Sequence, residues 1–575
     1  MPSSKLNLKY ATIGAAQGAL FIVLWLFDPT DPWLKAIDFA LYFTSLFTSL
    51  SFLLIYPKKP SVLQIKQVII IALLLGGLAT WLYVQYTPGD GYQHSRGESL
   101  FAWSMVAVLL AYIALPFIQT QSLFNRQAID YRALYRHSWD NFFVVALAGL
   151  FLLIFWLMIV LCTFLFKMLG ISAVEDFLYS PYFLLTSLPI MFTIGVGIGH
   201  EHEKVISTIR FIVLSICRYL LPLSALISLI FSVTLLFTGL EALWSTGVST
   251  HSLLWLIVIN LVFVNGVYQD GENTDQYPVI LKALVNLALM TLVVFACISI
   301  YSVYLRIDQY GLTPNRIYVM VISLVAFLYT ASHAWAAVRS LKSKLSNNWL
   351  AEIKTPNVIT AYLVAGLIIL LHSPYLDPYS LSARSQFKRA LDPGTDLNNF
   401  DFGVLEYKLG RPGLKYLAML EQGELDIPEV RRKLLQERIA LLRQSENYYS
   451  WKQGLRENKQ YNEARKISSF DPNRVIPENL TAAFDLNYCR DIECKVLFID
   501  LTRDGQEEAL IAEQKNWGSS RVYTMQEDKS WQFTATLQHQ SIDIFEQLSK
   551  GEYSFTEPHY KALTIKGKEL QIVPK

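Results

Sequence analysis

The chain has 575 residues and a net charge of +2, with 53% apolar and only 17% charged residues. Its charges concentrate late, because residues 1–373 hold 21 Lys/Arg and 17 Asp/Glu, whereas residues 374–575 hold 28 and 30. Soluble domains carry about 25% charged residues. The distribution excludes a cytosolic enzyme, a disordered chain and a soluble nucleic-acid-binding protein, and it predicts a membrane region followed by a soluble region.

The first region contains eleven apolar stretches that approach the length of about 20 residues needed to cross a bilayer. They cover residues 10–27, 36–56, 67–86, 100–120, 142–166, 178–199, 211–239, 252–269, 283–304, 317–338 and 355–373. The first stretch is longer than the apolar part of a signal peptide and ends without a small-residue cleavage site, so we expect it to be retained. The fold class is therefore a polytopic α-helical membrane protein with about eleven transmembrane helices and a C-terminal α+β domain.

The distribution of Lys and Arg between loops predicts the orientation. With a cytoplasmic N-terminus, fifteen of these residues lie in loops on the cytoplasmic side and five on the outer side. Such a bias is typical of membrane proteins. Because the number of spans is odd, the orientation places the C-terminal part outside.

Three parts are expected along the chain: a multi-span domain over 1–373, a polar linker over 374–410, and an exported α+β domain over 411–575. In the last part, helical signals precede runs of β-branched and aromatic residues that predict antiparallel strands. The predicted strands cover residues 495–501, 508–512, 521–524 and 531–537.

The exported part contains two of the five cysteines, Cys489 and Cys494. Two cysteines that close a short loop in an oxidising compartment favour a disulfide, with free thiols as the alternative.

Asp500 and Asp504 lie in an Asp-rich turn that resembles the calcium-binding turns of FG-GAP-like repeats. Calcium needs six to eight oxygen ligands, but Thr502 and Arg503 occupy positions where such ligands are expected. Asp-Gly is also an ordinary hairpin turn, which is the favoured interpretation. We therefore expect neither a bound metal ion nor a cofactor.

Ionisable side chains inside a bilayer are costly, so they are functional candidates. Arg218 lies near the start of the seventh stretch, where its side chain can also extend to the interface. His333 lies deeper in the tenth stretch, where it could relay protons or hydrogen-bond a neighbouring helix.

The short loop between the ninth and tenth stretches is densely polar. Gly311 can end one helix and Pro314 can begin the next, which explains the turn. The turn alone does not explain the polar side chains of Arg306, Asp308, Tyr310 and Arg316. Arginine binds phosphate through two parallel hydrogen bonds, so this loop is a candidate site for an anionic headgroup or polymer.

The order Arg306-x-x-x-Tyr310-Gly311-Leu312-Thr313-x-x-Arg316, late in a polytopic apolar region, resembles a bacterial membrane family known as domain of unknown function 4153. The resemblance covers roughly residues 10–373, with the exported part outside it. It implies the bacterial inner membrane but no particular activity. In that membrane, the orientation predicted from the loop charges corresponds to a cytoplasmic N-terminus and a periplasmic C-terminus.

Two functions are open. The first is a non-enzymatic envelope protein, either a transporter or an accessory or assembly factor, whose periplasmic domain contacts a protein partner. It would contact the bilayer and an anionic lipid or envelope polymer, but not nucleic acid. The sequence contains no Walker motif, so it does not indicate ATP-driven transport by this chain. The alternative is an envelope glycosyltransferase that uses a lipid-linked donor, with Asp28 or Asp31 as the base or metal ligand. Against it, their loop is short and Asp before Pro is an ordinary turn former.

Overall fold

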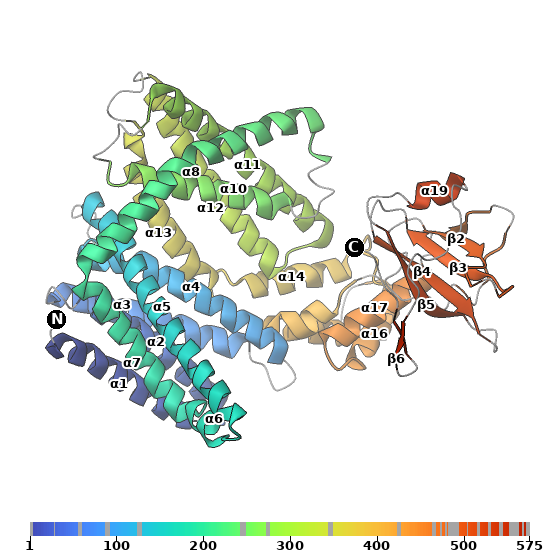
Figure 1. Cartoon of the computed structure of the whole chain (residues 1–575), viewed down its shortest axis with the longest axis horizontal. Coiled ribbons are helices and arrows are strands. Elements are labelled where there is room, and N and C mark those ends of the chain that lie inside the picture. Colours follow the sequence, from blue (N-terminus) through green and yellow to red (C-terminus); the bar gives the residue numbers. More distant parts are fainter. Residues whose placement is uncertain are drawn as a thin grey trace. The chain divides into compact units, whose positions relative to one another are not determined.

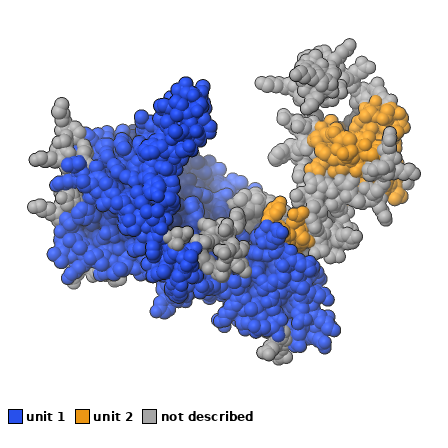
Figure 2. All heavy atoms as spheres, turned by 90° about the horizontal axis from the view of Figure 1, so that it is seen from below, with its two compact units in different colours: residues 1–448 blue, residues 449–575 orange. Residues whose placement is uncertain are grey.

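The computed structural model describes most of the chain as two compact units, residues 1–448 and 449–575 (Figure 2). The described residues are 4–27, 29–55, 60–86, 93–123, 129–241, 249–271, 277–342, 349–398, 400–422, 427–462, 467–471, 474–477, 480, 494–502, 504–513, 518–526, 531–539, 544–550, 563–565 and 568–570.

In the first unit, eleven helices within the described residues are long and apolar enough to cross a membrane. They are α1 (Ser4–Leu26), α2 (Pro32–Ile55), α3 (Val62–Tyr86), α4 (Gln93–Gln119), α5 (Tyr131–Met168), α7 (Pro181–Glu201), α8 (Glu203–Thr238), α10 (Ser249–Tyr268), α11 (Val279–Tyr310), α12 (Pro314–Lys342) and α13 (Lys354–Leu371). Each coincides with one predicted stretch, so the prediction of a polytopic helical membrane protein is confirmed. A short helix, α6 (Ala173–Leu178), separates α5 from α7.

Figure 1 shows how the helices are arranged. Their buried side chains form two apolar cores. The first core lies among α1–α5 and α7, with Leu75 and Leu110 fully buried in it. The second lies among α8, α10, α11 and α12, where Ile257 and Leu292 are fully buried. Helix α13 contacts both α4 and α12 and so joins the two groups.

Helix α1 packs unusually closely against α7. A Cβ atom at Gly14 would lie 2.6 Å from the Cα of Ile190, and one at Gly18 would lie 2.8 Å from the carbonyl oxygen of Leu185. The two backbones are therefore in direct contact, as in other membrane helix pairs that meet through small residues.

Residues 374–410, where the sequence predicts a linker, contain α14 (Pro378–Leu391) and a π-helical turn, η5 (Val404–Lys408). Helices α15 (Gly410–Glu421) and α16 (Glu429–Arg443) follow, and the boundary between the compact units comes only after Tyr448. The low hydropathy that suggested a linker reflects the exposed face of α14, while its other face buries Ala383 and Ala390.

An arginine of α16 connects this helix to η5 and α15. Arg443 donates from Nη1 to both carboxylate oxygens of Glu406 in η5, at 2.8 Å each, and from Nε to Glu421 of α15 at 2.8 Å. Because Glu406 is almost fully buried, this charge-assisted pair fixes η5 and α15 against α16.

The second unit begins with most of α17 (Tyr448–Asn462) and contains a five-stranded sheet in the order β1-β2-β3-β4-β5. The strands are β1 (Ile467–Ser469), β2 (Cys494–Ile499), β3 (Glu508–Glu513), β4 (Gly518–Met525) and β5 (Trp531–His539). Strands β2 to β5 pair antiparallel as predicted, whereas β1 pairs parallel to β2 and was not predicted. A short helix, α19 (Ile544–Lys550), and a hairpin of β6 (Leu563–Ile565) and β7 (Lys568–Leu570) follow, so the predicted α+β composition is confirmed.

Candidate functional site

The densely polar loop forms a tight turn between α11 and α12. The N–H group of Gly311 donates to the carbonyl of Ile307 at 2.7 Å, and Gly311 has a φ of 73° and a ψ of 179°. Helix α12 then begins at Pro314. The predicted roles of Gly311 as a helix end and Pro314 as a helix start are thus confirmed.

Beside this turn lies an open pocket of about 400 Å³ between α10, α11 and α12. Its lining residues are Thr250 and His251 from α10, Ser302, Val303 and Arg306 from α11, and Asn315, Arg316, Tyr318 and Val319 from α12. The structure therefore brings Arg306 and Arg316 together, and it adds residues of α10, far away in the chain, that the sequence did not indicate.

The two arginines of the pocket differ in how they are held. Arg316 donates from Nη1 to the carbonyl oxygens of Gly311 at 2.8 Å and Tyr310 at 3.3 Å, and its guanidinium lies 5.4 Å from the centre of the Tyr310 ring. The side chain of Arg306 has neither an ion pair nor a hydrogen bond among the described residues. As far as the described part of the chain is concerned, all donors of Arg306 are therefore available to a ligand.

The electrostatic character of the pocket is positive. Neither an Asp nor a Glu is among its described lining residues. Arg306 and Arg389 both act electrostatically on Arg316 as like charges. Such a group of guanidiniums without a carboxylate attracts anions.

Helix α14 holds the turn in place. Gln386 donates from Nε2 to the carbonyl oxygens of Leu312 at 2.8 Å and Tyr310 at 3.2 Å. Arg389 donates from Nη2 to the carbonyl oxygen of Gln309 at 2.9 Å. These carbonyls lie at and just beyond the end of α11, where such groups otherwise lack partners and where positive charge is favourable.

Two predicted members of the site, Asp308 and Tyr310, do not line the pocket. The backbone carbonyl of Asp308 accepts a hydrogen bond from Arg389, and the half-exposed ring of Tyr310 supports the guanidinium of Arg316. They build the turn and position one arginine of the pocket.

The start of α14 is anchored by a buried carboxylate. Asp377 is only 4% exposed, and it accepts hydrogen bonds from the N–H groups of Tyr379 and Ser380 at 3.1 Å each and from the Tyr86 hydroxyl at 2.5 Å. It thereby caps α14 and ties it to the end of α3.

On the wall of the pocket, a residue of α12 contacts the residue that follows α13. The Tyr318 hydroxyl, on the pocket wall, lies 3.4 Å from Nε2 of His372, and the two rings stack. His372 Nδ1 lies 2.8 Å from the carbonyl of Ile368, and burial lowers the pKa of this imidazole below its usual value. A neutral ring is therefore favoured next to the pocket.

The two candidates inside the membrane region lie apart from the pocket. Arg218 is exposed on α8, and its carbonyl oxygen accepts a hydrogen bond from the Tyr277 hydroxyl. His333 is fully buried, with Nδ1 lying 2.9 Å from the carbonyl oxygen of Tyr329, while its Nε2 has no hydrogen-bond partner among the described residues.

His333 adjoins a hydrogen-bonded cluster centred on Asn357. This side chain accepts from the Tyr329 hydroxyl at 2.5 Å and donates to the Tyr131 hydroxyl at 2.7 Å and to Oδ1 of Asn265 at 2.6 Å. The cluster joins α5, α10, α12 and α13, which is a structural role.

The carboxylates proposed for a glycosyltransferase are only partly described. Asp28 lies outside the described residues. Asp31 accepts hydrogen bonds at Oδ1 from the N–H groups of Trp33 at 2.8 Å and Leu34 at 3.1 Å. Asp31 thus caps the start of α2, where its charge is also favourable.

In the second unit, Asp500 and Asp504 stabilise the turn before β3. Asp500 Oδ2 accepts from the N–H of Gly505 at 3.0 Å, and Asp504 Oδ1 accepts from the N–H of Gln506 at 2.8 Å. Across the described ranges, no group of three or more His, Cys, Asp or Glu side chains is arranged to hold a metal ion.

The predicted disulfide falls partly outside the described residues. Cys489 is not described, whereas Cys494 begins β2 and is fully buried in the core of the sheet. The pairing therefore stays a prediction.

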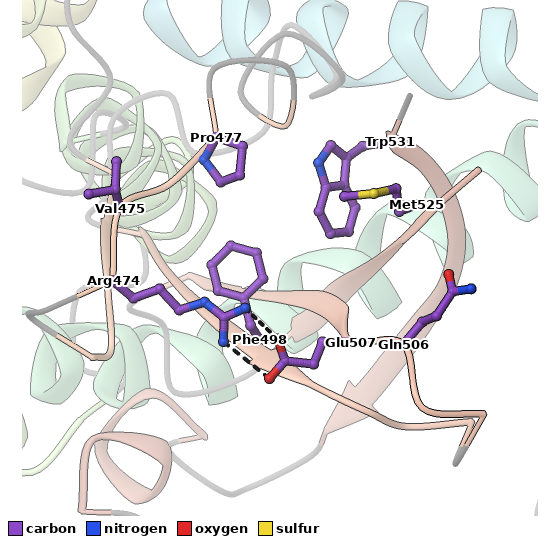
Figure 3. Close-up of a pocket in the computed structure, with 8 residues that line it drawn as sticks. All are labelled: Arg474, Val475, Pro477, Phe498, Gln506, Glu507, Met525 and Trp531. Atoms are coloured by element: carbon purple, nitrogen blue, oxygen red, sulfur yellow. Dashed lines mark hydrogen bonds and ion pairs between the residues drawn. The ribbon is translucent and has the colours of Figure 1, made fainter. Parts of the chain in front are cut away.

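The second unit has a pocket of its own, with a volume of about 460 Å³ (Figure 3). Arg474 forms two hydrogen bonds with Glu507 and lies 4.1 Å from the centre of the Phe498 ring. These hydrogen bonds hold the pKa of the Glu507 carboxyl below its usual value. Its two described charges are paired with each other, and Trp531 and Met525 add apolar surface to the lining.

A family model with the description Domain of unknown function (DUF4153) matches residues 19–420. Compared with the range of 10–373 expected from the sequence, the match begins later, at residue 19, and ends later, at residue 420. It includes all of α14, so the helix that holds the turn is part of the family region. A search of curated proteins and a search of solved structures find no match. Since the family model covers more than half of the chain, this multi-pass membrane protein belongs to the DUF4153 family.

Proposed function

We propose that this protein is a non-enzymatic component of the bacterial cell envelope, a transporter or an accessory or assembly factor that binds an anionic envelope ligand beside the α11–α12 turn. The observation that carries the proposal is the positive pocket, in which Arg306 has no partner among the described residues and no described carboxylate balances it. An arginine without a partner at such a site favours a ligand that supplies the negative charge.

The proposed location is the inner membrane, with a cytoplasmic N-terminus and a periplasmic second unit. The excess of Lys and Arg in the loops on the N-terminal side supports this orientation. A Cys489–Cys494 disulfide would be consistent with a periplasmic location. The pocket of the second unit, with Phe498 and Trp531, is the proposed contact site for a periplasmic protein.

Labelling of intact cells with a membrane-impermeant thiol reagent tests the orientation. Single cysteines would replace Gln309 in the α11–α12 region, Val475 in the second unit, and Ser207 at the opposite end of the bundle, in a background without other cysteines. We expect labelling at positions 309 and 475 and protection at 207. Labelling at 207 with protection of the other two would invert the topology and refute the periplasmic proposal.

Complementation of a deletion strain tests binding against the glycosyltransferase alternative, with leakage of a periplasmic enzyme as the readout. We expect Arg306→Gln to fail although the protein is inserted normally. Asp31→Asn preserves an oxygen that can cap α2 but removes the carboxylate that a glycosyltransferase would need. Loss of function in Asp31→Asn together with full function in Arg306→Gln would favour the enzyme.

A further inference from the structure

We propose that the pocket beside the α11–α12 turn binds the phosphate headgroup of a membrane lipid, whose hydrocarbon chains leave the pocket along α10 and α12 into the bilayer. This inference rests on the proposed anion-binding function and names the class of ligand.

The rim of the pocket suits a phosphate group. A guanidinium presents planar, parallel N–H donors that match two phosphate oxygens. Arg306 has no partner among the described residues, and Arg316 uses Nη1 on backbone carbonyls, which fixes its orientation. His251 and Asn315 add polar side chains to the same rim.

The floor of the pocket is apolar. Val303 lies three residues before Arg306 on α11, and Val319 lies three residues after Arg316 on α12, so each lies about 4.5 Å further from the turn. Both line the pocket, and Val303 is buried. The two hydroxyls at this depth satisfy each other, because Thr250 donates from Oγ1 to Ser302 Oγ at 2.9 Å. A free inorganic anion would gain nothing from this floor, whereas an amphiphile would bury apolar surface there.

The apolar surface continues toward the middle of the membrane region. On α12, Ile322 follows Val319 by three positions and is 52% exposed. On α10, Trp255 follows His251 by four positions and is 66% exposed. Residues separated by three or four positions share a helix face, so both helices lead from a polar rim to an exposed apolar face. This order of polar and apolar surface matches a lipid headgroup and its chains.

Thermal unfolding of the full-length protein in an uncharged detergent tests the inference. The probes are dioleoylphosphatidylglycerol, dioleoylphosphatidylcholine as a lipid without net charge, and inorganic phosphate. We expect the phosphatidylglycerol to raise the unfolding temperature in a saturable way at concentrations where neither of the other probes does. Arg306→Gln should weaken this binding by about tenfold to a hundredfold, because it removes charge-assisted hydrogen bonds.

Arg384→Gln is the matched control. Arg384 is an exposed arginine of α14 outside the pocket, so the change removes the same charge from the same unit. Binding that survives Arg384→Gln but not Arg306→Gln supports the site. Arg306→Lys, which keeps the charge but not the planar donors, should bind with intermediate affinity, and it replaces Arg306→Gln should that variant fail to fold.

The other outcomes separate the two proposals. Equal stabilisation by inorganic phosphate, abolished by Arg306→Gln, would overturn the lipid inference and leave the anion-binding function intact. Binding of no probe, or equal binding by both Gln variants and the wild type, would overturn both.

Discussion

Replacement of Gly311 by alanine should release α14 from the turn that it holds. A Cβ atom at this position would lie 2.5 Å from Cδ of Arg389 and 3.0 Å from Nε2 of Gln386. Both side chains would have to move and would lose hydrogen bonds to the end of α11. Hydrogen bonds that involve a charged group contribute about 1.5–3 kcal/mol, so we expect the docking of α14 to weaken by about 3 kcal/mol. That loss corresponds to a roughly hundredfold larger population of molecules in which α14 is detached from the turn.

Limited digestion with trypsin measures this population, because cleavage within α14, after Arg384 or Lys388, requires local opening. We expect Gly311→Ala to be cleaved there about a hundredfold faster than the wild type. Gly170→Ala is the control, because Gly170 has a similar φ of 77° but a Cβ atom there would have nothing within 4 Å. It should acquire backbone strain of about 1–3 kcal/mol without faster cleavage in α14. Equal rates of cleavage in the wild type and Gly311→Ala would refute the proposal that contacts with the α11–α12 turn keep α14 docked.

Three further outcomes follow from buried polar groups. Tyr86→Phe removes a hydrogen bond to the buried Asp377 carboxylate, worth about 1.5–3 kcal/mol. Trypsin should therefore cleave within α14 at least ten times faster than in the wild type. An unchanged rate would contradict the proposal that Asp377 anchors the start of α14. Burial lowers the pKa of His372, so the unfolded chain takes up a proton at higher pH than the folded one. The free energy of unfolding should therefore fall as the pH drops below about 6.5. Thermal unfolding between about pH 7.5 and 5 should show a smaller loss in His372→Gln than in the wild type. An identical pH dependence of the two proteins would contradict the role assigned to His372. Asn357→Ala removes three hydrogen bonds, each worth about 0.6 kcal/mol inside a membrane. The free energy of unfolding, measured by denaturation of the detergent-solubilised protein, should fall by about 2 kcal/mol. A decrease below about 0.5 kcal/mol would show that the cluster is not stabilising.

The membrane helices were predictable because a bilayer imposes a length and a composition on every span. The turn was predictable for a local reason, since Gly just after a helix and Pro at the first helical position are local signals for a helix end and a helix start. Arg306 and Arg316 could be paired from the sequence because only this short turn separates them. Their choice as a candidate site relied on an excess of charge that turn formation did not explain.

The rest of the pocket depends on tertiary packing. His251 and Thr250 come from α10, and no local pattern indicates that the start of this helix lies beside the end of α11. Helix α14 was also missed, because a helix that docks with one face and exposes the other has a low average hydropathy. The helical spacing of its small and apolar residues, including Ala383 and Ala390, was the available signal.

The close contact between α1 and α7 has a consequence for the synthesis of the protein. Gly14 emerges from the ribosome well before Ile190, the part of α7 against which it packs. At about 5–20 residues per second, this interval of roughly 180 residues lasts about 10 to 35 seconds. During that time the small-residue face of α1 has no native partner, because the membrane helices α2, α3, α4 and α5 are all made before α7. Helix α1 can meet α2 early, since Gln17 donates a hydrogen bond to Ser45 at 3.1 Å, but its contact with α7 must wait until α7 has been made.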